Sequence, residues 1–297
     1  MQSWTSKSKM RRFFIITNEH KDEGLEVTRE IKTYIEKKGG SCRYFVSTKS
    51  NWHASNADGS RELPKDAECI LVLGGDGTLV RAARDYAGYQ IPLIGVNLGT
   101  LGYLCELERR TVFSAIDRLF EDEYDIEERM LLGGSGICKG KVQEEKPALN
   151  DIVIHRTGAS QVINLVVSVN GEYLTTYSAD GIILATPTGS TGYSMSAGGP
   201  IVDPKAELIV ITPINSHDIN SKSIVVGSDA VVTIEIAQRR TERDEEADVS
   251  FDGDRSVPMG VGDRLVVKRA DRNTRILRLN RVSFLQILRK KMQEYHH

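Results

Sequence analysis

The sequence lacks a marked excess of either charge, which already excludes some classes of partner. Among its 297 residues, 39 are Lys or Arg and 41 are Asp or Glu, so the formal net charge is −2. This balance gives the chain no general electrostatic attraction for nucleic acids or for acidic membrane surfaces. We therefore expect neither a nucleic acid nor a membrane among its partners.

Cysteines and long apolar runs are also scarce. The cysteines are far apart and form no Cys-x-x-Cys pair, so they indicate neither a zinc site nor a disulfide framework. After the basic segment Met1 to Arg12, the apolar run Phe13 to Ile16 is too short for a signal peptide or a membrane span. An organellar transit segment stays open, but we expect a cytoplasmic protein with buried free thiols at Cys42, Cys69, Cys105 and Cys138.

Two common nucleotide-binding motifs are missing as well. The chain contains neither the Walker pattern Gly-x-x-x-x-Gly-Lys nor the fingerprint Gly-x-Gly-x-x-Gly. The sequence therefore supports neither a Walker-type phosphate loop nor ordinary Rossmann dinucleotide binding.

The first part of the chain alternates short β-branched runs with longer helical patterns, which predicts a parallel α/β sheet. One of these runs, Cys69 to Leu73, is wholly apolar, as a strand buried on both faces requires. The expected strands are Phe13–Thr17, Arg43–Ser47, Cys69–Leu73 and Ile91–Val96, and the expected helices are Lys21–Lys38, Thr78–Tyr86 and Thr111–Phe120.

Beyond Met130 the helical spacing largely gives way to strand-like runs separated by turn residues. Asn170-Gly171 lies between Val162–Val169 and Glu172–Tyr177, and this dipeptide favours a type I′ hairpin turn. Two further runs, Val231–Ala237 and Val249–Asp252, flank a charged tip at Arg239–Asp248, which we expect to be a solvated loop.

We therefore predict two domains. Residues 1–130 form an α/β domain with a Rossmann-like parallel sheet, and residues 131–274 form a β-rich domain. Helical spacing returns at Val282–Met292, so residues 275–297 are expected to rejoin the first domain.

A glycine loop, Gly74-Gly75-Asp76-Gly77-Thr78, joins the apolar strand to the helix that follows. Backbone N–H groups and a helix N-terminus favour a phosphate there, and glycines let the backbone approach it closely. The carboxylate of Asp76 would repel a phosphate unless Mg²⁺ or a proton-donating hydroxyl lay between them, and a kinase site supplies both. The alternative is a tight turn in which Asp76 merely caps the helix.

Three later segments narrow the kind of kinase. They are Gly95–Leu104, Leu149-Asn150-Asp151 and Asp180–Pro200, which includes Thr186-Pro187-Thr188-Gly189-Ser190-Thr191-Gly192-Tyr193-Ser194. Diacylglycerol and sphingosine kinases share the glycine loop, and phosphofructokinases have a related form of it. In order and spacing, however, residues 13 to 288 resemble the NAD kinase family in its compact bacterial form, ATP- or polyphosphate-dependent. This resemblance implies a phosphofructokinase-like first domain.

The resemblance also implies a reaction and a site. The γ-phosphoryl group of ATP, or of polyphosphate, would pass to the 2′-hydroxyl of the adenosine ribose of NAD to give NADP, with Mg²⁺ carried mainly by the nucleotide and no direct protein ligand assigned. The catalytic residue would be Asp76, which would orient or deprotonate that hydroxyl. The ATP phosphates would contact Gly74, Gly75, Gly77, Thr78 and Arg81, and NAD would contact Gly77, Asn150, Asp151, Asp180, Thr188, Thr191, Gly192, Tyr193 and Ser196. Family members are commonly homodimers or homotetramers, so Asp180 could serve a neighbouring subunit.

The residue types fit these roles, but each also has a purely structural interpretation. The donors and acceptors of Asn150 and Asp151 suit ribose hydroxyl and purine amino groups, although the pair could be a turn before a strand. Tyr193 resembles the aromatic residue that packs on a base, although its ring could instead be buried in the core.

Two departures from the family pattern affect the site. Gly192 replaces a frequent alanine, so a side-chain contact is lost there, although a backbone contact would survive. A second proline is missing from Thr212–His217, which makes a catalytic role for His217 doubtful and favours a structural one.

Two other functions stay open on the sequence. A lipid kinase would share the glycine loop, but the chain shows no basic amphipathic helix for a membrane surface. A catalytically silent NAD sensor is the second, and the presence of Asp76 argues against it.

Overall fold

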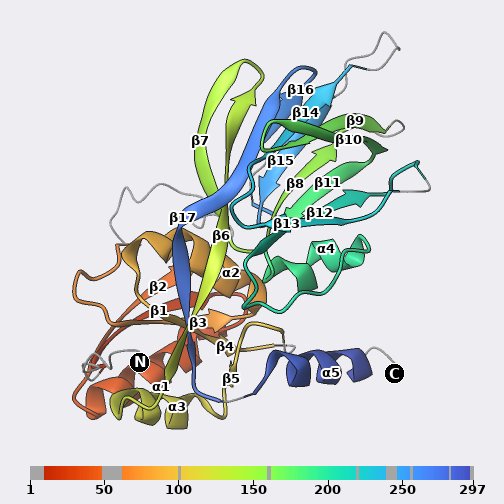
Figure 1. Cartoon of the computed structure of the whole chain (residues 1–297). Helices are drawn as coiled ribbons and strands as arrows, with labels where there is room; N and C mark the ends of the chain where they lie inside the picture. The colour runs from red at the N-terminus through yellow and green to blue at the C-terminus, as the bar shows by residue number, and fades with distance from the viewer. Residues whose placement is uncertain are drawn as a thin grey trace. The chain divides into compact units, whose positions relative to one another are not determined.

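The computed structural model describes residues 10–48, 62–99, 102–158, 162–218, 221–238, 246–254, 257–280 and 282–294. Its contacts divide the chain into two compact units, Met1–Glu128 with Thr274–His297, and Arg129–Asn273. Two long strands, β6 (Asp125–Cys138) and β17 (Arg264–Arg278), begin in one unit and end in the other (Figure 1). The two units are called unit 1 and unit 2 below.

Unit 1 contains a parallel sheet whose strands lie in the order β2-β1-β3-β4-β5. The central strand β3 is buried along its whole length, as the apolar run Cys69–Leu73 predicts. The strands are β1 (Arg12–Asn18), β2 (Ser41–Ser47), β3 (Cys69–Gly74), β4 (Leu93–Asn97) and β5 (Leu107–Glu108).

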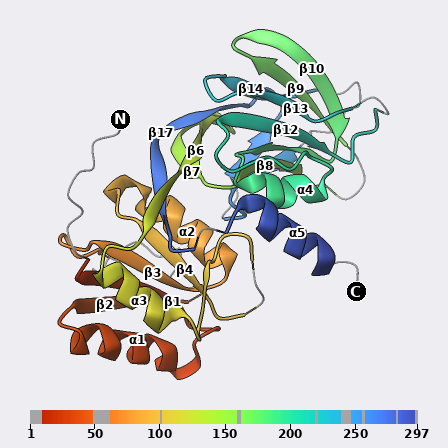
Figure 2. The ribbon, with the colours of Figure 1, turned by 60° about the horizontal axis from the view of Figure 1, so that its bottom comes forward.

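Helices cover both faces of this sheet, because alternate residues of each strand point to opposite sides. On one face, α1 (Glu26–Lys37) and α3 (Val112–Phe120) form a core with Phe13 and Ile15 (Figure 2). On the other face, α2 (Asp76–Tyr86) packs so that the rings of Phe14 and Tyr86 lie 6.2 Å apart. The short helices η1 (Glu23–Leu25) and η2 (Ala87–Tyr89) and the C-terminal α5 (Phe284–Glu294) complete unit 1.

The helices α1 and α2 begin at residues other than those predicted from the sequence. The helix expected from Lys21 begins at Glu26, because the buried carboxylate of Asp22 accepts hydrogen bonds from the backbone N–H groups of Val27 (3.0 Å) and Thr28 (2.9 Å). The helix expected from Thr78 begins two residues earlier, at Asp76, so three of the five residues of the glycine loop are helical. A carboxylate is favourable in the first turn of a helix.

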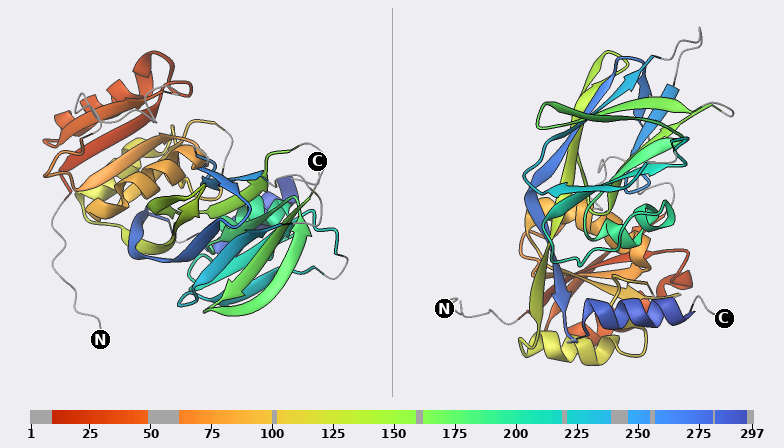
Figure 3. Two further views of the ribbon diagram at one scale, coloured as in Figure 1. Left: turned by 90° about the horizontal axis from the view of Figure 1, so that it is seen from above. Right: turned by 45° about the vertical axis from the view of Figure 1, so that its right-hand side comes forward.

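Unit 2 is built from two antiparallel sheets that pack face to face (Figure 3). One sheet has the order β13-β12-β11-β8-β15-β16, and β10-β9-β14-β17 follow one another in the other. The core between them contains Ile154 and Leu184 from the first sheet and Leu165 and Ile234 from the second. The strands are β7 (Lys141–Ala148), β8 (Asp151–Arg156), β9 (Ile163–Val169), β10 (Glu172–Ala179), β11 (Gly181–Ala185), β12 (Leu208–Ile214), β13 (Ile224–Gly227), β14 (Val232–Ala237), β15 (Glu246–Phe251) and β16 (Val257–Gly260).

The structure confirms the predicted α/β and β-rich regions and most of the local predictions. Asn170 and Gly171 have φ angles of 53° and 82°, which a type I′ turn between β9 and β10 requires. The charged tip is a partial exception, since Glu246–Asp248 belong to β15, and the rest of that segment lies outside the described residues. All four cysteines are free and buried, as expected. No helix in the described ranges is long and apolar enough to cross a membrane.

Candidate functional site

The glycine loop lies at the carboxyl end of β3, where the order of strands in unit 1 changes direction. The chain passes from β1 to β2 on one side and then to β3 on the other, and ligands of such sheets bind at this switch point. Asn18, at the end of β1, donates from Nδ2 to Oγ1 of Thr78 over 3.2 Å. The loop is therefore fixed at the position where a doubly wound sheet binds its ligand.

The glycines of this loop differ in what they contribute. A Cβ at Gly74 would lie 2.5 Å from Oγ1 of Thr78, so this glycine is needed for close packing. A Cβ at Gly75 or Gly77 would meet no atom within 4 Å, so the space beside these residues is open. The N–H groups at the very start of a helix have no acceptor within it, and in α2 the bonds to the carbonyl of Gly75 begin only with the N–H of Thr78 (2.9 Å). An open helix start of this kind favours an anion.

Asp76 has three backbone partners that the sequence does not reveal. Its Oδ2 accepts from the N–H groups of Tyr103 (2.5 Å) and Leu104 (3.1 Å), and its Oδ1 accepts from that of Cys105 (3.0 Å). A Cβ on Gly102 would overlap the carboxylate. Asp76 therefore holds residues 102–105 against α2, and only glycine at position 102 allows that approach.

The same geometry leaves Asp76 able to accept a further hydrogen bond. A carboxylate offers about four lone-pair positions, and three are taken by N–H groups. The thiol of Cys105 also interacts with Asp76: burial first, the charge of Asp76 second and a hydrogen bond to Asp76 third raise the pKa of that thiol. A hydroxyl is a stronger donor than a thiol, so it can take the remaining position. Arg81, one turn along α2, makes no ion pair with the described residues.

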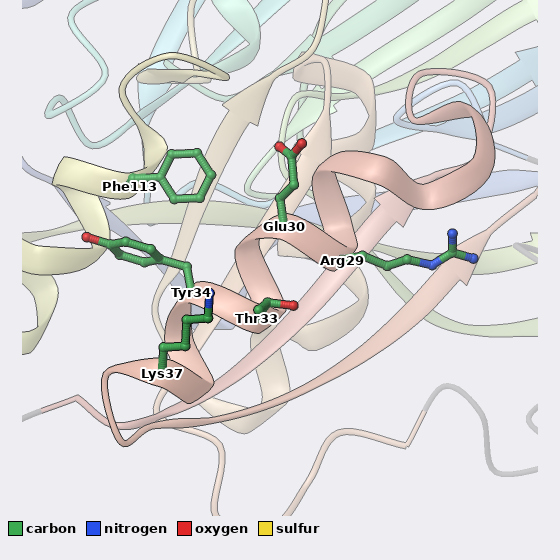
Figure 4. A pocket seen from close by; sticks show the side chains of 6 residues that line it. All are labelled: Arg29, Glu30, Thr33, Tyr34, Lys37 and Phe113. Carbon is green, nitrogen blue, oxygen red and sulfur yellow. The ribbon is translucent and has the colours of Figure 1, made fainter.

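Unit 1 has two surface hollows. One, of about 370 Å³, adjoins the start of the glycine loop: its lining includes Lys21, Asn97 and Leu98, and the N–H of Leu98 donates to the carbonyl of Gly74 (2.8 Å). The other, of about 390 Å³, is lined by residues of α1 and by Phe113 of α3 (Figure 4). None of the residues predicted to form the site lines either hollow, so we assign neither hollow to the site.

In unit 2, Asn150 and Asp151 lie at the start of β8 and are positioned by a second aspartate. Asp252 accepts the N–H groups of Leu149 (2.9 Å, at Oδ2), Asn150 (2.7 Å, at Oδ1) and Asp151 (3.2 Å, at Oδ1). The amide oxygen of Asn150 is buried and has no hydrogen-bond partner among the described residues. A buried acceptor without a partner is costly, so it is a candidate contact for a ligand donor.

The carboxyl group of Asp151 is in an unusual electrostatic environment. Its side chain is buried, and burial together with the charge of Asp252 raises its pKa to about 7. Burial is the larger cause. A carboxyl group with this pKa is partly protonated at neutral pH, so it can donate as well as accept a hydrogen bond.

The loop Thr186–Gly192 lies directly over this pair. Thr186 donates from its N–H to the carbonyl of Asn150 (2.9 Å) and from its Oγ1 to the carbonyl of Leu149 (2.6 Å). A Cβ on Gly189 would overlap the carbonyl oxygen of Asn150. A Cβ on Gly192 would lie 3.9 Å from Oδ2 of Asp151, so an alanine there would touch the pair.

The other predicted residues of this segment have different surroundings. Thr188 is buried and accepts a hydrogen bond from the buried Arg129 (3.1 Å), whereas Thr191 donates to the carbonyl of Thr188 (3.3 Å). Tyr193 begins the short α4 (Tyr193–Ser196), and 43% of it is exposed, so its ring is not part of the core. Ser196 is also exposed. The side chains of Tyr193 and Ser196 are therefore accessible to a ligand.

Asp180 is not brought together with Asn150 and Asp151. It precedes β11, whose Gly181 pairs with His155, whereas Asp151 pairs with Ala185 at the other end of β8. Asp180 lies five residues from Ala185, so at about 3.3 Å per residue Asp180 and Asp151 are about 17 Å apart along the strand. Hydrogen bonds from Asn215 first, and from Arg156 second, lower the pKa of Asp180.

Several contributing residues were missed by the sequence analysis. Asp252 follows a strand and precedes Gly253, as Asp180 precedes Gly181, so its pattern could have been noticed. Arg156 and Arg129 carry no such signal in the sequence.

His217 donates from its backbone N–H to the carbonyl of Ser178 (2.9 Å), and its side chain is exposed.

Comparisons with known proteins assign the chain to one family. A family model described as the ATP-NAD kinase N-terminal domain matches residues 13–124, and one described as the ATP-NAD kinase C-terminal domain matches residues 149–279. An NAD kinase from Agathobacter rectalis is 53% identical over 96% of this chain and 100% of its own length. An NAD kinase from Lachnoclostridium phytofermentans is 43% identical over 95% of this chain and 99% of its own.

Solved structures share the fold. A yeast NADH kinase complexed with NADH has a TM-score of 0.81 at 22% identity, covering 97% of this chain and 89% of its own. An NAD kinase from Archaeoglobus fulgidus in complex with ATP has a TM-score of 0.73 at 20% identity, covering 95% of this chain and 98% of its own. The lipid-kinase alternative finds no support in these matches.

Proposed function

The chain belongs to the NAD kinase family and is an enzyme that makes NADP, and from this premise we propose how its residues carry out the reaction. The γ-phosphoryl group of ATP passes to the 2′-hydroxyl of the adenosine ribose of NAD. The observation that carries the proposal is the 53% identity to an NAD kinase over nearly the whole chain. The residue assignments rest on acceptor atoms of the two units that protein donors leave wholly or partly unsatisfied.

In unit 1, we assign the phosphates of ATP to the open start of α2. Gly75 and Gly77 leave room for them, Thr78 lies one residue further along the first turn, and Arg81 supplies a charge without a competing ion pair among the described residues. Asp76 accepts the hydrogen of the 2′-hydroxyl in the lone-pair position that its backbone partners leave.

In unit 2, we assign the adenosine part of NAD to the Asn150–Asp151 pair. The buried amide oxygen of Asn150 lacks a protein partner, so it accepts a hydrogen bond from a ribose hydroxyl or a purine amino group. Tyr193 offers an exposed ring on which the base can pack. The remaining NAD contacts in this proposal are Asp180, Thr188, Thr191, Gly192 and Ser196.

The chemical step exchanges one bond to phosphorus for another. The 2′-oxygen forms a bond to the γ-phosphorus, the bond between that phosphorus and the β,γ-bridging oxygen breaks, and ADP leaves. The proton of the hydroxyl passes to Asp76 and then to solvent. General-base assistance contributes about 10²- to 10⁴-fold in rate, while positioning and charge neutralisation supply most of the remainder.

We propose that Mg²⁺ is the divalent cation of the reaction. Among the described residues there is no group of three or more His, Cys, Asp or Glu side chains suited to a metal. Mg²⁺ is commonly bound through substrate phosphates and few protein ligands. The residues therefore fit an ion that arrives mainly on ATP and neutralises the charge that develops on the phosphates.

Location and assembly complete the proposal. Four free, buried thiols suit a reducing compartment, which supports a cytoplasmic protein. We also propose a homodimer or a homotetramer, which size-exclusion chromatography with light scattering would distinguish from a monomer.

A coupled assay tests the proposed function. Purified protein is incubated with NAD, ATP and Mg²⁺, and NADP is detected with an NADP-specific dehydrogenase. We expect NADP to accumulate and chelation of the cation to abolish its formation. Parallel reactions with polyphosphate and with NADH define the donor and acceptor preferences. Tight NAD binding without product would instead indicate a nucleotide sensor and would refute the proposal.

A further inference from the structure

We propose that Arg156 is a positioning residue for dinucleotide binding and that it acts by holding the carboxylate of Asp180. This inference rests on the proposed function, in which Asp180 contacts NAD. It adds a residue that neither the sequence motifs nor the proposed set of contacts contains.

Two side chains fix the carboxylate of Asp180 from both sides. Nε of Arg156 donates to Oδ1 over 2.5 Å, and Nδ2 of Asn215 donates to Oδ2 over 3.0 Å. A further guanidinium nitrogen of Arg156 donates to the carbonyl of Gly158, which holds the arginine itself in place. With one directed bond on each oxygen, the carboxylate has a defined plane and direction.

The backbone places these three residues together at one end of three neighbouring strands. Arg156 ends β8, Asp180 precedes β11, and Asn215 follows β12, which are adjacent in the sheet. The N–H of Arg156 donates to the carbonyl of Asp180 (2.9 Å), and the N–H of Asp180 donates to that of Ile214 (2.9 Å). The cluster is therefore built on the rigid part of unit 2.

The ion pair between Arg156 and Asp180 is partly buried. The side chains of Arg156 and Asp180 are 21% and 20% exposed, so solvent screens them only in part. Charge-assisted hydrogen bonds in such surroundings are stronger and more directional than exposed ones. Without Arg156, Asp180 would keep one partner and a carboxylate charge that a phosphate-bearing ligand would meet without compensation.

The loss of Arg156 should weaken the binding of NAD and leave the binding of ATP unchanged. Asp180 has a contact with NAD in the proposed function, whereas the ATP phosphates are assigned to unit 1. We therefore expect the substitution Arg156→Gln to raise KM for NAD by about tenfold, as the loss of one charge-assisted bond suggests, with kcat and KM for ATP changed by less than about twofold. Arg156→Lys keeps the charge without the guanidinium geometry and should recover part of the loss.

A double-mutant cycle tests whether Arg156 acts through Asp180. Steady-state constants are measured for the wild type, Arg156→Gln, Asp180→Asn and the double variant. Arg264→Gln serves as the matched control, because it breaks an exposed ion pair with Glu235 in the same unit. If the proposal holds, Arg156→Gln has an effect of less than about twofold on KM for NAD once Asp180 is Asn.

Each outcome has a distinct meaning. An unchanged KM for NAD in Arg156→Gln, or effects that multiply in the double variant, would overturn the inference while leaving the proposed function intact. If the wild type made no NADP, the proposed function itself would fail. Should Arg156→Gln not fold, the comparison of Arg156→Lys with Arg264→Gln decides, and an unchanged KM in Arg156→Lys would overturn the inference.

Discussion

The raised pKa of Asp151 predicts that this carboxyl group opposes folding as the pH rises. In the unfolded chain its pKa has the ordinary value of 3.8, and in the folded protein burial and the charge of Asp252 raise it to about 7. Between these values the folded state binds the proton more tightly than the unfolded state does. The stabilisation from this proton is thus complete below about pH 4 and is lost as the pH rises to about 7.

The size of the effect follows from the difference between the two pKa values. A difference of about three units corresponds to about 4 kcal/mol, which we take as an upper value for the free energy. Asp151→Asn keeps a polar side chain of similar shape and does not titrate. Relative to this variant, the wild type should therefore lose free energy of unfolding between pH 5 and pH 8.

Denaturant unfolding at pH 5, 6, 7 and 8 measures this difference directly. Subtracting the variant from the wild type removes the titrations that both proteins share. We expect the wild type to become progressively less stable than Asp151→Asn, with most of the change below pH 7. A difference that stays constant across this range, or that changes in the opposite direction, would refute the reasoning.

Three further predictions concern other parts of the molecule. Gly102→Ala places a Cβ in the carboxylate of Asp76, so kcat for NADP formation should fall by about 100-fold or more, and an effect below twofold would contradict the role of that contact. Tyr193→Ala removes an exposed ring, so KM for NAD should rise about fivefold with the melting temperature unchanged, and an unchanged KM would argue against stacking. Burial raises the pKa of all four thiols, that of Cys42 to about 12. The native protein should therefore resist alkylation at pH 8, whereas mass spectrometry should find four labels on the unfolded protein. Rapid labelling of the native protein would contradict this.

The parts of the fold that local chemistry determines could be predicted from the sequence. The Asn170-Gly171 turn needs positive φ at both residues, which these two residue types tolerate, so the hairpin was predictable. The all-apolar run Cys69–Leu73 predicted a strand buried on both faces, because such a strand needs apolar side chains on both sides. The start of α1 was missed because the cap is supplied by Asp22 through side-chain bonds to Val27 and Thr28, not by the residue next to the helix.

The sequence predicted candidate residues for the site but not their contacts. Asp76 was identified from its position in the glycine loop, yet its partners lie at residues 103–105 and are reached only through the fold. Asn150 and Asp151 were identified by resemblance, whereas the carboxylate that orients their backbone comes from Asp252, about a hundred residues later. Contacts over such distances depend on strand order and register, which a single sequence does not determine.

The central claim is that Asp76 assists phosphoryl transfer from ATP to NAD. The direct measurement is kcat of Asp76→Asn with NAD, ATP and Mg²⁺ all saturating, together with thermal unfolding and NAD binding, because the carboxylate also holds three backbone N–H groups. We predict a fall in kcat of about 100-fold or more while the variant still folds and binds NAD. A kcat near that of the wild type would contradict the claim.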